Sequence, residues 1–240
     1  MPLVPVMAVV FVAALVRAAF GFGDALVGMP LLVLWIPLRA ATPLLAMVAP
    51  VLSLALLARE WRHLNLRGAV RLIVSTVAGI PVGLLLLKRV DESLVDLVLA
   101  AVIILFAAYN LLRPGLLRLR TERAAPAFGF VAGILGAAYN TNGPPVVIYG
   151  ALRGWPPETF RATLQGYFLP TGLAILIGQG IAGLWTKPVV TAFLASLPAA
   201  LLAVLLGGAL GRRIPAARFR SAVYLLMLAL GLVLMIKTIF

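Results

Sequence analysis

Ten apolar segments, separated by short polar or glycine-containing stretches, make up most of this 240-residue chain. Hydrophobic residues are 63% of the sequence and charged residues 11%, which is too apolar for a soluble domain of this length. The lipid bilayer must therefore be the main solvent of the folded chain. A helix needs about 20 residues to cross a hydrocarbon core of about 30 Å. The segments that meet this length are 40–58, 68–88, 93–113, 161–181, 187–211 and 217–237.

The other segments form two pairs, 3–20 with 24–37 and 126–139 with 144–152, and each pair is interrupted in its middle. The first break is Phe20 to Asp24, which holds two glycines, and the second break is Tyr139 to Pro145. A straight helix cannot continue through the second break, because a glycine and two prolines follow three polar residues. We expect one helix to end near Tyr139 and another to begin near Pro144, within the membrane. The amino end of the new helix then offers free N–H groups and a positive dipole end to an anion.

Basic residues form short clusters between the apolar segments, and the net charge is +13. No basic domain stands apart from these segments to bind nucleic acid, so the positive-inside rule explains the clusters better. The three clusters expected in the cytoplasm are Arg59, Arg62, Arg67 and Arg71, then Arg113, Arg118, Arg120 and Arg123, then Arg212, Arg213, Arg218 and Arg220. All three reach one side only if 126–152 is a re-entrant hairpin that enters and leaves on the cytoplasmic side. By the same reasoning, 3–37 is a hairpin from the outside.

The two halves of the chain are similar to each other. A shift of 119 residues places Arg17–Asp24 on Gly136–Gly143, and a shift of 120 places Pro50 on Pro170. We predict an all-α membrane protein with two inverted repeats, each a broken re-entrant helical hairpin plus three transmembrane helices. Chance similarity between apolar sequences is the alternative. The predicted units are a first repeat at 1–113, a cytoplasmic linker at 114–125 and a second repeat at 126–240.

Small residues four apart, at Gly79 and Gly83 and at Gly207 and Gly211, indicate close packing of helices rather than chemistry. The chain has one histidine and no cysteine, so it lacks the residues for a metal site, a disulfide or a histidine-activated nucleophile. We therefore expect no metal, no cofactor and no enzymatic activity.

Arg17 and Asp24 are the charges placed most clearly within an apolar stretch. Charge buried in lipid is costly, so such residues usually mark a site or a pathway. Two interpretations remain open: Arg17 pairs with Asp24 and only locks the hairpin, or Arg17 faces a bound anion. Asp24 is also a candidate carrier of a coupling proton, because a dry site raises the pKa of an acid.

The second break offers uncharged donors, which suit an oxyanion that must bind and leave again. These donors are the side chains of Asn140, Thr141 and Asn142 and the backbone N–H of Gly143. Capping of the broken helix ends is the alternative role for these side chains. Gln165 lies in a predicted span, where it either lines the cavity or bonds to another helix. The residues predicted to bind substrate are Arg17, Phe20, Gly21, Gly23, Asp24, Tyr139, Asn140, Thr141, Asn142, Gly143, Pro144 and Gln165.

Over most of its length the chain resembles the sulfite exporter TauE/SafE family, also described as TSUP-type probable membrane transporter proteins. In that family the first break carries a run of glycines followed by a proline, and Gly21-Phe22-Gly23-Asp24 with Pro30 occupies that place here. Asn142-Gly143-Pro144 matches the end of the family's second break. This sequence departs from the pattern at Asp24 and at Asn140-Thr141-Asn142, where glycines are more usual. Since these positions are predicted to touch substrate, the family's substrate list transfers poorly.

The resemblance implies a multi-pass secondary transporter in a bacterial inner membrane. It implies export or uptake of a small sulfur-containing or organic anion, such as sulfite or a sulfonate. We expect export, with the anion bound at the midplane between the two breaks. The expected partners are this anion and the bilayer, while coupling to a proton or another ion and assembly into a homo-oligomer stay open. The rival interpretations are an anion channel, an intramembrane enzyme and a membrane subunit that transports nothing.

Overall fold

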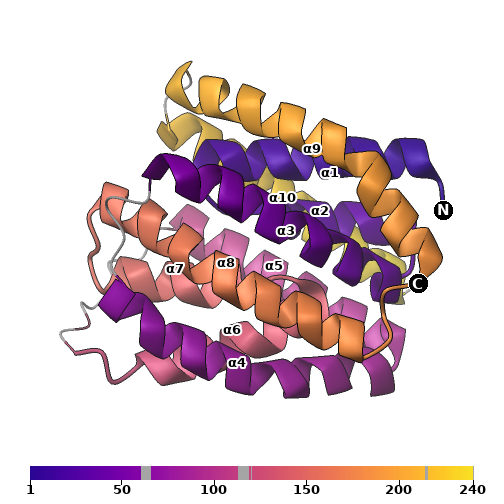
Figure 1. Ribbon diagram of the computed structural model, residues 1–240, viewed down its shortest axis with the longest axis horizontal. Helices are drawn as coiled ribbons and strands as arrows, with labels where there is room; N and C mark the ends of the chain where they lie inside the picture. Colours follow the sequence, from indigo (N-terminus) through magenta and orange to yellow (C-terminus); the bar gives the residue numbers. More distant parts are fainter. Residues whose placement is uncertain (61–65, 113–118, 120, 214–215, 240) are drawn as a thin grey trace.

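The computed structural model describes residues 1–60, 66–112, 119, 121–213 and 216–239, and all regular structure within these residues is helical. Each predicted apolar segment forms one helix (Figure 1). The helices are α1 (Leu3–Phe20), α2 (Asp24–Val33), α3 (Leu38–Glu60), α4 (Leu66–Arg89), α5 (Glu92–Leu112), α6 (Ala125–Tyr139), α7 (Gly143–Leu152), α8 (Pro157–Ile181), α9 (Lys187–Arg213) and α10 (Ala216–Ile239).

Two boundaries differ from the prediction by four residues, and proline explains both. α2 ends at Val33 rather than at residue 37, and a turn follows in which Ile36 N–H bonds to Leu32 O at 2.9 Å. The next residue is Pro37, which disfavours helical backbone in the residue before it. α8 begins at Pro157 rather than at residue 161, because a proline is well tolerated in the first turn of a helix.

Both predicted breaks are present. α1 ends where Gly21 takes a φ of 86°, and Gly23 has a φ of 100°, a left-handed region that glycine adopts without strain. α6 ends at Tyr139, and the next residue, Asn140, has a φ of 55°, the one positive value at a non-glycine residue in the described chain. Pro144 and Pro145 fill the first turn of α7, where a missing N–H costs nothing. Neither broken helix continues across its interruption.

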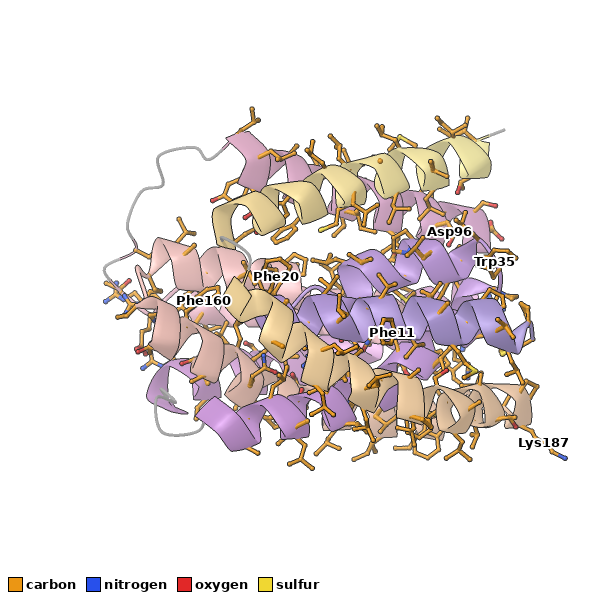
Figure 2. All side chains as sticks on the ribbon, turned by 90° about the horizontal axis from the view of Figure 1, so that it is seen from above. Phe11, Phe20, Trp35, Asp96, Phe160 and Lys187 are labelled. Atoms are coloured by element: carbon orange, nitrogen blue, oxygen red, sulfur yellow. The ribbon has the colours of Figure 1, made fainter. Side chains whose placement is uncertain are left out.

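Polar contacts define two opposite ends of the helix bundle. At one end, Arg39 donates to Leu87 O at 3.1 Å and Lys88 donates to Ala182 O at 2.9 Å, which joins α3, α4 and α8. At the other end, Leu119 N–H donates to Leu152 O at 2.9 Å. Figure 2 shows the same separation, with Phe160 toward one end and Trp35 and Lys187 at the other.

The two broken hairpins open toward opposite ends of the bundle (Figure 1). The start of α1 and the end of α2 lie at the end that holds the start of α3. The approach to α6 and the end of α7 lie at the other end, where the bond between Leu119 and Leu152 joins them. Figure 2 places Phe20, beside the first break, between the two ends of the molecule. Both breaks are therefore inside the bundle.

The hairpin helix of each half packs against a long helix of the other half, α1 on α9 and α6 on α4. Glycines permit this approach: a Cβ on Gly79 would lie 2.2 Å from Phe130 O, and one on Gly83 would lie 2.3 Å from Ile134 O. A Cβ on Gly207 would similarly lie 2.7 Å from Leu15 O in α1. The predicted close packing at these glycines is confirmed. α3 packs on α8, and α5 pairs with α10 along one face (Figure 2).

Four helices within the described residues are long and apolar enough to cross a membrane: Leu3–Phe20, Leu38–Ala58, Ala69–Arg89 and Lys187–Ala209. α1 is therefore long enough to span by itself, although the sequence assigned it to a hairpin. α5, α8 and α10, the other predicted spans, are helices of 21, 25 and 24 residues. Of the three arginine clusters, the side chains of Arg71 and Arg123 are described, and the others lie outside the described side chains.

Candidate substrate site at the two helix breaks

The two breaks meet at a small pocket of about 10 Å³, called the junction pocket below. Its walls are residues 23–26 at the start of α2, residues 140–144 between α6 and α7, and Phe168 of α8. Segments more than 100 residues apart in the sequence therefore share one buried polar space. Of the predicted site residues, the pocket brings together Gly23, Asp24, Asn140, Thr141, Asn142, Gly143 and Pro144.

Arg17 lies behind the junction pocket and is 3% exposed. Its Nη1 donates to Asp24 Oδ2 at 2.7 Å, while its Nη2 donates to Ser53 Oγ at 2.5 Å and to Gln165 Oε1 at 3.4 Å. The guanidinium also lies 5.0 Å from the centre of the Phe168 ring, a cation–π distance. Arg17 does not line the pocket itself, whereas Asp24 does. The buried pair has no net charge, so Arg17 offsets the carboxylate that faces the pocket.

Gln165 connects α8 to the first break. Its Nε2 donates to the backbone oxygen of Gly21, and its Oε1 accepts from Arg17. The Gly21 carbonyl belongs to the left-handed residue that ends α1. Gln165 thus donates to a buried carbonyl that the interrupted helix leaves without a partner. Bonding to another helix was one of the two roles predicted for Gln165, and its bond to Arg17 of α1 is of this kind.

The second break is fixed by bonds to α3 and α8. Thr42 donates to Ala138 O at 3.1 Å, and Gln179 donates to Ala137 O at 3.3 Å. Asn142 Nδ2 donates to Thr171 Oγ1 at 3.3 Å instead of capping α7, although Asn142 is the N-cap residue. The amino end of α7 therefore has no side-chain cap, and of its first three residues Gly143 alone has a backbone N–H, because Pro144 and Pro145 have none.

Asn140 differs from Thr141 and Asn142, whose side chains both make hydrogen bonds. It is 6% exposed and lines the junction pocket, yet its amide makes no hydrogen bond to any residue that the structure describes. A buried amide without a partner costs free energy unless a water or a ligand satisfies it. This side chain and the uncapped end of α7 together present donors to the same small space.

Several predicted site residues lie beside the junction pocket rather than in its walls. Phe20, Gly21 and Gln165 surround Arg17 or the first break, and Tyr139 is buried at the end of α6. The sequence reading did not single out Ser53 and Thr171, which bond to Arg17 and Asn142. Both are polar residues within predicted spans and fully buried, which is the available signal for them.

A comparison with family models decides the identity of the chain. The family model described as Sulfite exporter TauE/SafE matches residues 6–234, which include every helix break and every wall of the junction pocket. The chain belongs to the TauE/SafE family. No curated protein and no solved structure matched the chain. As a TauE/SafE protein it is a multi-pass membrane transporter and not an enzyme.

Proposed function

We propose that this TauE/SafE protein is a secondary transporter that exports a small sulfur-containing or organic anion, such as sulfite or a sulfonate. The anion binds at the junction pocket, between the two breaks. One observation carries the proposal: the breaks of two separate hairpins meet in one buried pocket that holds an unused amide and an uncapped helix end. The family description names a sulfite exporter, which supports an oxyanion as the guest.

Uncharged donors supply the attraction in this proposal. Asp24 at the start of α2 already offsets the positive end of that helix, and Arg17 offsets Asp24. The donors that remain for the anion are the N–H of Gly143, at the amino end of α7, and the amide of Asn140. Such donors bind an oxyanion without holding it as tightly as a free guanidinium would. The arrangement suits a carrier, which must release the anion after transport.

The packing of the two halves supports two inverted repeats with boundaries at 1–113 and 126–240. α1 packs on α9 in the same way that α6 packs on α4, so exchanging the halves reproduces the pairing. The glycines that permit these contacts, Gly83 and Gly207, are 124 residues apart, which is also the spacing that aligns Lys88 with Arg212. Transporters of this kind alternate access by rocking one repeat against the other around a midplane site.

The orientation and location follow from the charges in this proposal. The arginine-rich end, with Arg71 and Arg123, faces the cytoplasm of a bacterial cell, and the protein lies in the inner membrane. No nucleotide motif is present in the sequence, so an ion gradient or the substrate gradient drives export. A coupling proton on Asp24 and a homo-oligomer are both compatible with this arrangement.

Sulfite flux in liposomes that contain the purified protein tests the proposal. Wild-type protein is expected to show saturable counterflow, which also separates a carrier from a channel. Asn142→Ala and Arg17→Ala should both reduce the flux, because one weakens the second break and the other frees Asp24. Asn110→Ala is the matched control, since among the described residues the Asn110 side chain bonds to Phe106 O of its own helix. If both Asn142→Ala and Arg17→Ala keep the full wild-type flux, the junction pocket is not the substrate site.

A further inference from the structure

A second, much larger cavity lies between α5 and the α6–α7 hairpin. Its volume is about 710 Å³, and almost all of its lining is apolar. α5 contributes Leu105 and Phe106, α6 contributes Val131, and α7 contributes Pro144 and Ile148. On the other side of the bundle, α10 packs directly against α2. We call this space the side cavity.

The inner wall of the side cavity is also a wall of the junction pocket. Pro144 lines both spaces, because it stands at the first turn of α7. Phe106 lines the side cavity, and its ring lies edge-on to Phe22 of the first break, with centroids 6.4 Å apart. The large apolar space and the small polar one therefore lie on two sides of Pro144, next to the two breaks.

We propose that the side cavity is a subsite for a hydrocarbon tail, and that the substrate is an amphipathic organic anion. The anionic group binds at the junction pocket, and the tail extends past Pro144 and Phe106 into the side cavity. This inference rests on the proposed function. Ligand sites typically have 300–1,000 Å³ of mostly apolar space with a few polar groups that fix the orientation. The two spaces together match that composition, whereas sulfite alone would leave the side cavity unused.

The position of the polar groups distinguishes this guest from a membrane phospholipid. Leu105 is 69% exposed, so the side cavity opens toward the lipid-facing surface, and an acyl chain is the competing occupant. A phospholipid keeps its headgroup at the membrane surface, outside the hydrocarbon core. Here the polar donors line the junction pocket at the helix breaks, on the other side of Pro144 from the side cavity. A guest with its charged end directed inward satisfies them, and a phospholipid does not.

A series of sulfonates tests the tail subsite. Sulfite counterflow in liposomes is inhibited with methane-, propane- and hexanesulfonate, and flux in protein-free liposomes is subtracted. The half-inhibiting concentration is expected to fall by about fourfold for each added methylene that the cavity buries. Two variants place a tryptophan in the side cavity: Ala108→Trp on α5, and Val131→Trp at its lipid-facing mouth. Each should make hexanesulfonate bind no better than methanesulfonate.

Val98→Trp is the control, because Val98 is an exposed residue of α5 outside the cavity lining, and it should keep the wild-type series. If the wild-type protein transports sulfite but the three sulfonates inhibit it at equal concentrations, the tail subsite is overturned and the proposed function stays intact. If longer sulfonates inhibit more strongly and both tryptophan variants keep this dependence on chain length, the tail subsite is also overturned, and the side cavity is assigned to a lipid acyl chain. A wild-type protein that moves neither sulfite nor any sulfonate would overturn the proposed function as well.

Discussion

Arg17 Nη1 lies 2.7 Å from Asp24 Oδ2, and this ion pair joins the last turn of α1 to the first residue of α2 across the first break. Both side chains are buried, and Ser53 and Gln165 hold the other amino group of Arg17. The pair thus fixes the angle between two helices whose backbone is interrupted. It also keeps the carboxylate beside the junction pocket neutralised.

Removal of either partner of this pair should destabilise the protein strongly. Arg17→Gln leaves Asp24 as an uncompensated buried charge, and Asp24→Asn does the same to Arg17, so each should cost about 3–5 kcal/mol. The double variant should cost clearly less than the sum of the two, because no charge remains. Thermal unfolding of purified protein in detergent measures the three values.

The exposed pair of Arg71 and Glu122, 3.4 Å apart, is the control for this experiment. Arg71→Gln should cost at most about 1 kcal/mol, since solvent screens an exposed pair. Additive losses at Arg17 and Asp24 would contradict the coupling inferred from their contact.

Asn140 separates the backbone role of the second break from its side-chain role. Asn140→Gly keeps the φ of 55° without strain, whereas Asn140→Ala should lose about 1 kcal/mol, because alanine resists left-handed backbone. Both variants remove the amide from the junction pocket, so both should weaken the apparent affinity for sulfite to a similar degree. Thermal unfolding and sulfite counterflow, measured on the same preparations, check the two effects. A glycine variant with wild-type affinity would show that the amide does not bind the anion.

The helix breaks were predictable because glycine and proline act on their own backbone. Gly21 and Gly23 take left-handed backbone, and Pro144 stands in the first turn of α7, so the sequence alone located both interruptions within a residue or two. The direction of Arg17 was not predictable in this way. Its partners Ser53 and Gln165 are 36 and 148 residues away, and only the fold brings them together.

The faces of the helices were equally hard to predict. A helix in lipid is apolar all around, so hydrophobic periodicity does not show which side meets a neighbour. The side cavity illustrates this limit, because Leu105 and Phe106 are adjacent apolar residues with opposite exposure. Gly79 and Gly83 were exceptions, since small residues four apart mark a contact face directly.

Close packing between α4 and α6 should make Gly79 intolerant of any side chain. A methyl group there would lie 2.2 Å from a backbone oxygen, which cannot move without shifting α6. Gly79→Ala should therefore lower the melting temperature by several degrees or prevent folding. Gly172→Ala is the control, because its new methyl would lie 3.7 Å from Pro50, at ordinary contact distance. The yield of monodisperse protein and its melting temperature measure the difference, and equal tolerance at the two sites would refute the packing argument.

Gln165 and Gln179 form a matched pair that distinguishes the break from the rest of α8. Both are buried glutamines of α8 that donate to a backbone oxygen, of Gly21 in the first case and of Ala137 in the second. Leucine at either position leaves one buried carbonyl without a partner, so each variant should lose about 1–3 kcal/mol of stability. Only Gln165→Leu also removes a bond to Arg17 and frees the first break, so it should reduce sulfite flux by far more than Gln179→Leu does. The comparison uses the sulfite flux per folded molecule, with the folded fraction of each variant taken from its thermal unfolding curve. Equal flux in the two variants would mean that the first break takes no part in transport, and that the contacts of Arg17 serve stability alone.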